Sequence, residues 1–162
     1  MQAIRLKPHS TVYWSCLAQC LYIQAANNND NQRMLKSALE YLRVAVSLKP
    51  TDHLLWNALG VVAAHPGRLK TLEHLKRIWI CWIGLNESGF AQHCFFKSLQ
   101  FQRTAVVYTN LGFLYYRYDN IEMANKAFSN AQQTDPMYSL AWIGQVEQLF
   151  LSVIQTWMET IF

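Results

Sequence analysis

The chain has 162 residues, 52% of them hydrophobic and only 15% charged, with a formal net charge of +4. This length is enough for one domain with a buried core, and so apolar a composition predicts surfaces that other elements or chains cover. The basic residues are scattered, which predicts no direct nucleic-acid binding. We find neither a secretory signal nor an apolar run long enough to cross a membrane, and we therefore expect a soluble, intracellular protein.

A first helix pair is predicted in residues 11–52. Its aromatic anchor, Trp14, begins an apolar stripe at helical spacing, and the polar run at 27–31 predicts the turn between the two helices. The other residues of the pattern are Leu17, Ala18, Leu21, Ala38, Leu42, Ala45 and Pro50. The preceding segment, residues 1–10, repeats the closing Ala-to-Pro spacing and is predicted to end an earlier repeat.

A second unit is predicted in residues 53–104, with an insertion near 65–88. Its pattern residues are Trp56, Leu59, Gly60, Ala63, Ala91, Phe95 and Ser98. The insertion combines a helix-like first half with a second half that is apolar on every side. It admits three interpretations: a partner-docking element, an extra helix folded on its own repeat, or a peptide introduced at a mispredicted exon boundary. We favour the last two.

The third unit, residues 105–138, has the most complete pattern, and a partial last unit follows in residues 139–162. Tyr108 and Trp142 are 34 positions apart. Between them stand Leu111, Gly112, Tyr115, Ala124, Phe128, Ala131 and Pro136. The pair Asp119–Asn120 predicts the turn and the cap of the second helix. In the last unit, Gln145 and Val146 replace the expected Leu and Gly.

These positions resemble the tetratricopeptide repeat (TPR), a helix–turn–helix unit with a 34-residue period. The resemblance implies an all-α solenoid of about three repeats with partial flanking helices. Arrays of this kind need polar capping units at their ends. Neither end of this chain supplies one, so we expect either an excerpt from a longer repeat array or a gene product whose missing ends are filled by other chains.

The sequence offers no convincing catalytic or metal site. Cys16 and Cys20 share a helix face, but zinc needs two further ligands, so we expect them to be buried, reduced thiols. His93 and Cys94 are adjacent on a predicted helix and do not face each other. We find no phosphate-binding Gly-rich loop and no paired carboxylates. The sequence therefore predicts neither an enzyme nor a bound cofactor.

Several stretches resemble the scaffold subunits of superkiller (Ski) complexes more closely than the general repeat requires. They lie at 53–63, 91–99, 109–112, 120–122 and 141–145. This resemblance implies a cytoplasmic protein with a possible nuclear pool. It also implies a non-catalytic scaffold that holds a DExH-box RNA helicase and a β-propeller (WD-repeat) subunit and supports exosome-mediated 3′-to-5′ RNA decay. Neither direct nucleic-acid contact nor a membrane is expected.

Partner contacts are predicted on the concave face, which the first helix of each repeat lines. By helical spacing the candidates are Asn57, Val61, Thr109, Phe113, Tyr116, Arg117, Ile143 and Glu147. The alternative is that these side chains pack against neighbouring repeats. Two rival functions remain: a cochaperone module that clamps an acidic C-terminal peptide, which requires Lys or Arg in the groove, and RNA binding along a basic, aromatic-lined groove.

Overall fold

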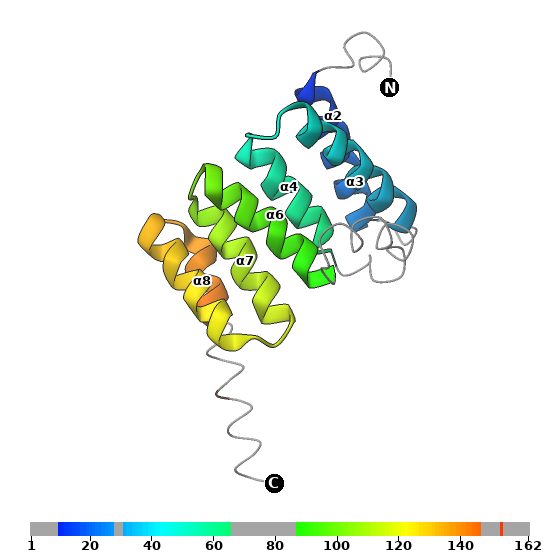
Figure 1. The fold of residues 1–162 in the computed structure, drawn as a ribbon. Helices are drawn as coiled ribbons and strands as arrows, with labels where there is room; N and C mark the ends of the chain where they lie inside the picture. Colours follow the sequence, from blue (N-terminus) through cyan, green and yellow to red (C-terminus); the bar gives the residue numbers. More distant parts are fainter. Residues whose placement is uncertain (1–9, 28–30, 66–86, 147–152, 154–162) are drawn as a thin grey trace. The chain divides into compact units, whose positions relative to one another are not determined.

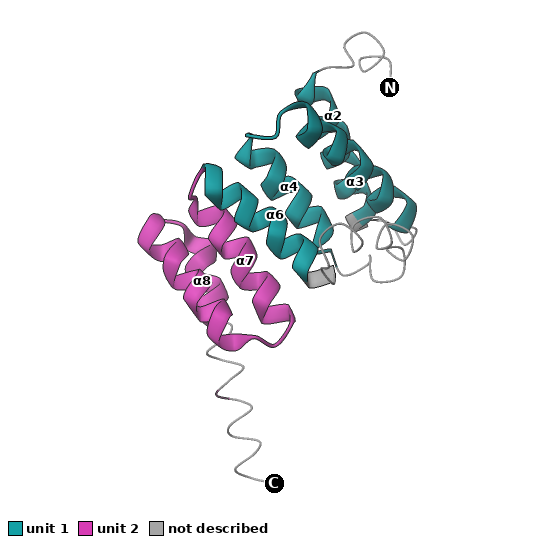
Figure 2. Ribbon diagram, viewed as in Figure 1, with its two compact units in different colours: residues 1–101 teal, residues 102–162 magenta. Residues whose placement is uncertain are grey.

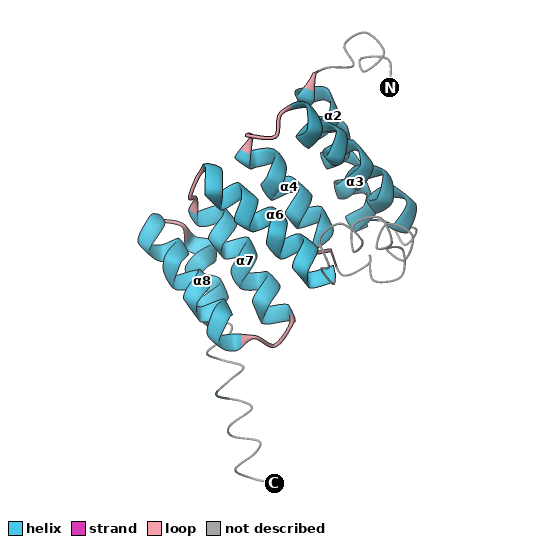
Figure 3. Ribbon diagram, in the orientation of Figure 1, coloured by secondary structure: helices cyan, strands magenta, loops and turns pink. Residues whose placement is uncertain are grey.

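The computed structural model describes residues 10–27, 31–65, 87–146 and 153. They form helices joined by short turns, and none of these residues lies in a strand (Figures 1 and 3). The helices are α2 (Thr11–Asn27), α3 (Asn31–Leu48), α4 (His53–Ala63), α6 (Glu87–Phe101), α7 (Ala105–Arg117) and α8 (Ile121–Thr134), and residues 139–146 are also helical. The predicted all-α helix–turn–helix architecture is confirmed. Most of the predicted insertion, residues 66–86, lies outside the described residues.

The chain divides into two compact units, Met1–Phe101 and Gln102–Phe162 (Figure 2). In the first unit, α2 packs on α3, α4 packs on α6, and α3 also packs on α4. In the second unit, α7 packs on α8. Each helix pair therefore corresponds to one predicted repeat, and α3 joins the first repeat to the next.

The turns between helices are closed by polar side chains at the helix starts. The Asp52 carboxylate accepts a hydrogen bond from the Leu54 N–H at 3.1 Å and an ion pair from Lys49 at 2.9 Å. The Asn120 side chain caps α8 by accepting from the Met123 N–H at 3.2 Å. Asp119, just before it, has a φ of 58°, a left-handed conformation that Asp and Asn tolerate better than most residues. The predicted turn at Asp119–Asn120 is thus confirmed.

The tryptophan anchors make the same hydrogen bond in both units. The Trp56 indole N–H donates to the Pro50 carbonyl at 2.7 Å, and the Trp142 indole N–H donates to the Pro136 carbonyl at 3.0 Å. Tyr108, the anchor of the third repeat, has no Pro six residues before it. In both cases the Trp therefore fastens its helix to the turn that precedes it, and Trp56 also packs against the core cluster of the first unit.

Core packing within a repeat depends on one small residue facing one large one. A Cβ added to Gly60 would lie 2.6 Å from the Phe95 ring, and one added to Gly112 would lie 2.6 Å from the Phe128 ring. Both rings are almost completely buried. These glycines let the two helices of a repeat approach closely enough for a buried Phe to fill the space between them.

The first repeat solves the same packing problem with different residues. Ala18 stands where Gly60 and Gly112 stand, and Leu42 replaces the Phe. Both residues are buried in one core cluster, at 0% and 1% exposure. Ala18 is larger than the glycine of the other repeats, and Leu42 is smaller than their phenylalanine. The close-packed volume between the two helices is therefore preserved.

Two cysteines depart from the prediction. Cys94 is buried, but Cys16 and Cys20 are exposed on α2, so the expectation that both were buried thiols was wrong. The physical reason is that no described element packs on their side of α2, although helical spacing placed them correctly on one shared face.

Candidate protein-interaction surface

The predicted contact residues on α4 are only partly accessible. Asn57 and Val61 are both half-buried. Neither can be assigned to a partner or to the core by exposure alone, so their role as contacts stays a prediction. The fully buried residues of this helix, Leu55, Leu59, Gly60 and Val62, lie on its other faces.

Thr109 on α7 is placed in the core, contrary to its predicted role. Its side chain is 1% exposed, and its hydroxyl has no hydrogen-bond partner among the described residues. Helical spacing predicted it on the contact face, but neighbouring side chains bury this position. A buried Thr109 cannot contact a partner in this conformation.

The other candidates in the second unit differ in what they contact. Phe113 packs edge-on against Phe128 with ring centroids 5.2 Å apart, so it is partly a packing residue, as the alternative interpretation proposed. Tyr116 is half-buried and Arg117 is exposed. Ile143 is 54% exposed. Glu147 lies outside the described residues.

A set of exposed aliphatic side chains was missed by the sequence analysis. Two residues before each aromatic anchor, every first helix carries an exposed aliphatic residue. These residues, which we call the leading aliphatics, are Val12, Leu54, Val106 and Leu140, with exposures of 61%, 64%, 40% and 46%. The signal was available in the sequence, because their spacing from the anchor never varies.

The leading aliphatics share one repeat position, and all of them are exposed. Single exposed aliphatic residues occur on most proteins. Here they recur at one position of the repeat, so that each compact unit carries two of them. Val12 and Leu54 lie in the first unit, and Val106 and Leu140 in the second. Each unit therefore exposes two aliphatic side chains at the same position of its first helices.

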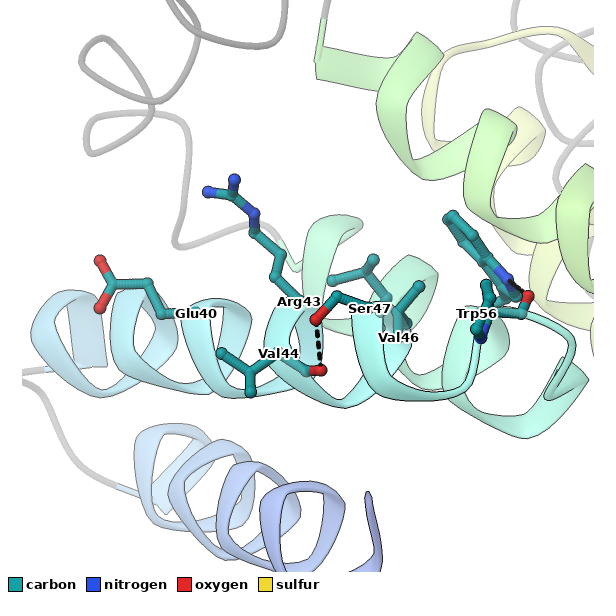
Figure 4. A pocket seen from close by; sticks show the side chains of 8 residues that line it. Glu40, Arg43, Val44, Val46, Ser47 and Trp56 are labelled. Atoms are coloured by element: carbon teal, nitrogen blue, oxygen red, sulfur yellow. Dashed lines mark hydrogen bonds between the residues drawn. The ribbon is translucent and has the colours of Figure 1, made fainter. Parts of the chain in front are cut away.

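A pocket of about 540 Å³ lies between α3 and α4 (Figure 4). Its lining consists of Glu40, Arg43, Val44, Val46, Ser47, Pro50, Trp56 and Leu59. The Ser47 hydroxyl already donates to the Val44 carbonyl at 2.8 Å, and the Trp56 indole is held by Pro50. The pocket therefore presents apolar surface with a polar rim. No nucleophile and base converge in it.

Two titratable groups near the second repeat have shifted pKa values. Burial lowers the pKa of His93 below its ordinary value of 6.5, and the positive charge of Lys97 lowers it further. Its ring meets Trp56 edge-on, with centroids 6.3 Å apart. Burial alone would raise the pKa of Asp52, but hydrogen bonds from Lys49 and from the Leu54 N–H outweigh it and hold the pKa below 3.8. Both shifts follow from packing and capping.

The described residues, 10–27, 31–65, 87–146 and 153, contain neither a metal-binding group of side chains nor a membrane-spanning helix. Among these residues, no three His, Cys, Asp or Glu side chains come together in a way that could hold a metal ion. No helix within them is long and apolar enough to cross a membrane.

Comparison with known proteins gives consistent relatives. No known protein-family profile matches the chain. It is 43% identical to human superkiller complex protein 3 over 129 residues, which is 79% of this chain and 7% of that protein. It is 42% identical to the mouse protein of the same name over 118 residues, and 36% identical to tetratricopeptide repeat protein 37 of Xenopus laevis over 118 residues. Each of these two alignments covers 72% of this chain and 6% of the relative.

A solved structure supports the same fold. The chain is similar to the crystal structure of a thermophilic TPR protein from Thermus thermophilus, with a TM-score of 0.72 over 92% of this chain and 69% of that one. At 16% identity this likeness concerns the fold alone. The chain spans only 6–7% of the length of the curated relatives it matches. The chain has the tetratricopeptide repeat fold, and over the aligned residues it is similar to a short segment of superkiller complex protein 3.

Proposed function

We propose that this chain is a non-catalytic protein-binding segment of a superkiller-type scaffold, and that it supports exosome-mediated 3′-to-5′ RNA decay. The observation that carries the proposal is the sequence similarity to superkiller complex protein 3 at 42–43% identity over 72–79% of the chain. The helix pairs favour a binding role, because they supply exposed apolar surface without convergent reactive groups.

The proposed partners are a DExH-box RNA helicase and a β-propeller (WD-repeat) subunit, met in the cytoplasm or in a smaller nuclear pool. Each unit has its own proposed contact residues: Val12 and Leu54 in the first unit, and Val106, Leu140, Arg117 and Ile143 in the second. Burial of exposed aliphatic side chains favours association, and arginine is enriched among the residues that carry binding energy at interfaces. Direct nucleic-acid binding is not part of the proposal, because the charge is mixed and scattered.

The rival cochaperone function finds no support in the first helices. A clamp for an acidic peptide tail needs several basic side chains on them. α2 and α4 contain no Lys or Arg, and α7 contains only Arg117. The available surface is apolar, so the rival is retained only as an outcome of the binding experiment.

The experiment measures binding of the purified chain to each purified partner by titration calorimetry. Leu54→Asp and Val106→Asp each replace one leading aliphatic by a charged residue. Both positions lie in the first turn of a first helix, where an acidic residue is compatible with the helix dipole. Each is expected to weaken binding at least tenfold. Met123→Asp is the matched control, because Met123 is 36% exposed in the first turn of α8, a second helix.

Equal loss of binding in all three variants would show that the leading aliphatics are not the contact surface. Failure of the folded chain to bind either partner would contradict the scaffold assignment. Binding of an acidic C-terminal peptide instead, with steep salt dependence, would favour the cochaperone function.

A further inference from the structure

The turn that follows α8 carries a strongly exposed methionine. Met137 is 90% exposed, the highest value among the large hydrophobic side chains that the structure describes. It stands one residue after Pro136, and the corresponding residue of the first unit, one after Pro50, is Thr51. A polar residue is therefore compatible with this repeat position, and the apolar one is particular to the second unit. We call residues 135–138 the methionine turn.

Hydrogen bonds on both sides of Met137 hold the methionine turn in one conformation. The Met137 N–H donates to the Asp135 carboxylate at 3.0 Å, and the Tyr138 N–H donates to the Asp135 carbonyl at 3.2 Å. The Trp142 indole N–H donates to the Pro136 carbonyl at 3.0 Å. A side chain presented by a backbone that is already ordered loses less conformational entropy when it binds.

The pocket between α3 and α4 in the first unit suits an apolar side chain. Two polar groups of its lining already donate hydrogen bonds, the Ser47 hydroxyl to the Val44 carbonyl and the Trp56 indole N–H to the Pro50 carbonyl. An occupant meets donors that are engaged, so an apolar group fits there better than a polar one that would lose its water. A methionine adds a favourable contact between its sulfur and the Trp56 ring. The volume of about 540 Å³ also leaves room for other atoms of the turn.

The corresponding site of the second unit is polar. When Pro50 is aligned with Pro136, the apolar lining residues Val44, Val46 and Leu59 correspond to Asn130, Gln132 and Gln145. The Gln132 side-chain amide donates to the Gln145 side-chain oxygen at 2.6 Å, so these two polar groups satisfy each other. The first unit thus presents this apolar pocket and a polar turn, and the second unit presents the exposed methionine. Every copy of the chain carries both features on different surfaces.

The charges beside the two features are complementary. Arg43 and Glu40 belong to the pocket lining, and Figure 4 shows Arg43 and Trp56 extending to the same side of α3, with Glu40 farther along the helix. Asp135, in the methionine turn, is exposed. An ionised carboxylate can accept more bonds than the one from the Met137 N–H, and a guanidinium offers five donors. Attraction to Arg43 and repulsion from Glu40 therefore favour one orientation of the turn in the pocket.

We propose that the pocket between α3 and α4 binds the methionine turn of a second copy of the chain. Met137 enters the pocket beside Trp56, and Asp135 lies against Arg43. The contact is heterologous, because the turn and the pocket are different surfaces. It is also small, so the association is weak and depends on concentration. The inference goes beyond the proposed function, because neither the helicase nor the β-propeller takes part in it.

The pocket and the leading aliphatic of the same helix lie on opposite sides of α4. At about 100° per residue, Leu54 lies about 170° around the helix from the midpoint of Trp56 and Leu59. A substitution at Leu54 therefore leaves the pocket intact. This separation allows self-association and the proposed partner binding to be tested independently.

Sedimentation velocity over a range of chain concentrations measures the self-association. We expect the mean mass of the wild-type chain to rise with concentration. Met137→Asp places a charge in the turn, and Ser47→Glu places a charged side chain in the pocket, so each is expected to weaken the association at least tenfold. Met137→Leu keeps an apolar side chain and is expected to retain it. Circular dichroism melting establishes that the variants fold.

Two further variants are matched controls for added charge. Leu48→Glu adds the same charge as Ser47→Glu at the next residue of α3, about 100° around the helix and outside the pocket lining. Leu54→Asp adds a charge on the far side of α4. Both are expected to retain self-association.

Mixing the two weakened variants tests the heterologous contact directly. The Met137→Asp chain keeps an intact pocket, and the Ser47→Glu chain keeps an intact turn. A mixture of them is therefore expected to form 1:1 dimers and nothing larger, although each variant alone stays monomeric. A loss of stability in either variant would not be repaired by mixing.

Three results would overturn the proposal. One is a folded wild-type chain that sediments as a monomer at every concentration. Another is self-association that survives Met137→Asp or Ser47→Glu, or that Leu54→Asp abolishes, because the contact would then lie elsewhere. The third is a mixture of the two weakened variants that stays monomeric while both fold.

Discussion

At the scale of single residues, the repeats conserve volume rather than identity. Gly112 faces Phe128, whereas Ala18 and Leu42 hold the same two positions in the first repeat. The sequence pattern predicted the positions of all four residues in their helices. It did not predict their pairing, which became visible only when the distance from each glycine to the opposite ring was known.

Adding a methyl group at Gly112 is expected to destabilise the chain. Its Cβ would lie 2.6 Å from a ring that is fully buried. Overpacking costs about 1–3 kcal/mol, of which Ala recovers about 1 kcal/mol through its helix propensity. Urea unfolding of Gly112→Ala, Phe128→Leu and the double variant measures the coupling. The double variant, which copies Ala18 and Leu42, is expected to lose less than the sum of the single losses. Strict additivity would refute the pairing.

Thr109 was predicted at a binding face and is buried instead. Thr109→Val keeps the side-chain shape and removes a buried hydroxyl without a partner, so the free energy of unfolding is expected to rise by about 1 kcal/mol. Ser98→Ala is the contrasting control, because the Ser98 hydroxyl donates to the His53 carbonyl at 2.7 Å. It is expected to lose about 1 kcal/mol. A loss of stability in Thr109→Val would show that its hydroxyl has a partner.

At the scale of helices, caps and small residues decide where each element begins and how close it comes to its neighbours. The turn at Asp119–Asn120 was predictable, because residues that tolerate a positive φ and cap helices are few. The packing of the last helix was not. Its glycine, Gly144, comes two residues before Val146, where the pattern places a glycine. Only the structure shows that the Phe128 ring packs against Gly144. The short distance in sequence between Trp142 and Gly144 made this unit look like a departure from the repeat pattern.

Asp52 is expected to stabilise the start of α4 mainly as a cap. Asp52→Ala should lower the free energy of unfolding by about 1 kcal/mol. Asp52→Asn, which keeps a capping oxygen and loses the ion pair with exposed Lys49, should lose less. Because the folded pKa lies below 3.8, this group's pH-dependent stabilisation is present above pH 3.8 and is lost as the pH falls through the folded pKa. Unfolding titrations at pH 7 and pH 3 measure both effects. Equal losses in the two variants would contradict the capping role.

His93 on α6 is expected to make stability fall in mild acid. Its folded pKa lies below 6.5, so the unfolded chain binds protons more readily there. The free energy of unfolding therefore decreases as the pH falls through 6.5 toward the folded pKa. Thermal melts of the wild type and of His93→Gln between pH 8 and pH 5 check this. The variant should show a smaller decrease, and an identical pH dependence would rule out the contribution of His93.

At the scale of the whole chain, the fold was predictable because one pattern recurs with fixed spacing. Each recurrence confirms the others, and the helix pairs follow directly. The candidate surface was less predictable, because exposure depends on what packs beside each helix. Helical spacing predicted that Asn57 and Thr109 both lie on the contact face. In the structure Asn57 is half-buried and Thr109 is buried. The prediction that Cys16 and Cys20 are buried was wrong for the opposite reason, because no described element covers them.

The most direct test of the proposed function is reconstitution. The purified chain is mixed with the purified DExH-box helicase and β-propeller subunit of a superkiller complex and analysed by size-exclusion chromatography with light scattering. We expect the chain to co-elute with at least one partner in fixed ratio, and we expect this co-elution to be lost in Leu54→Asp but not in Met123→Asp. A folded chain that elutes apart from both partners at micromolar concentration would contradict the proposed scaffold function.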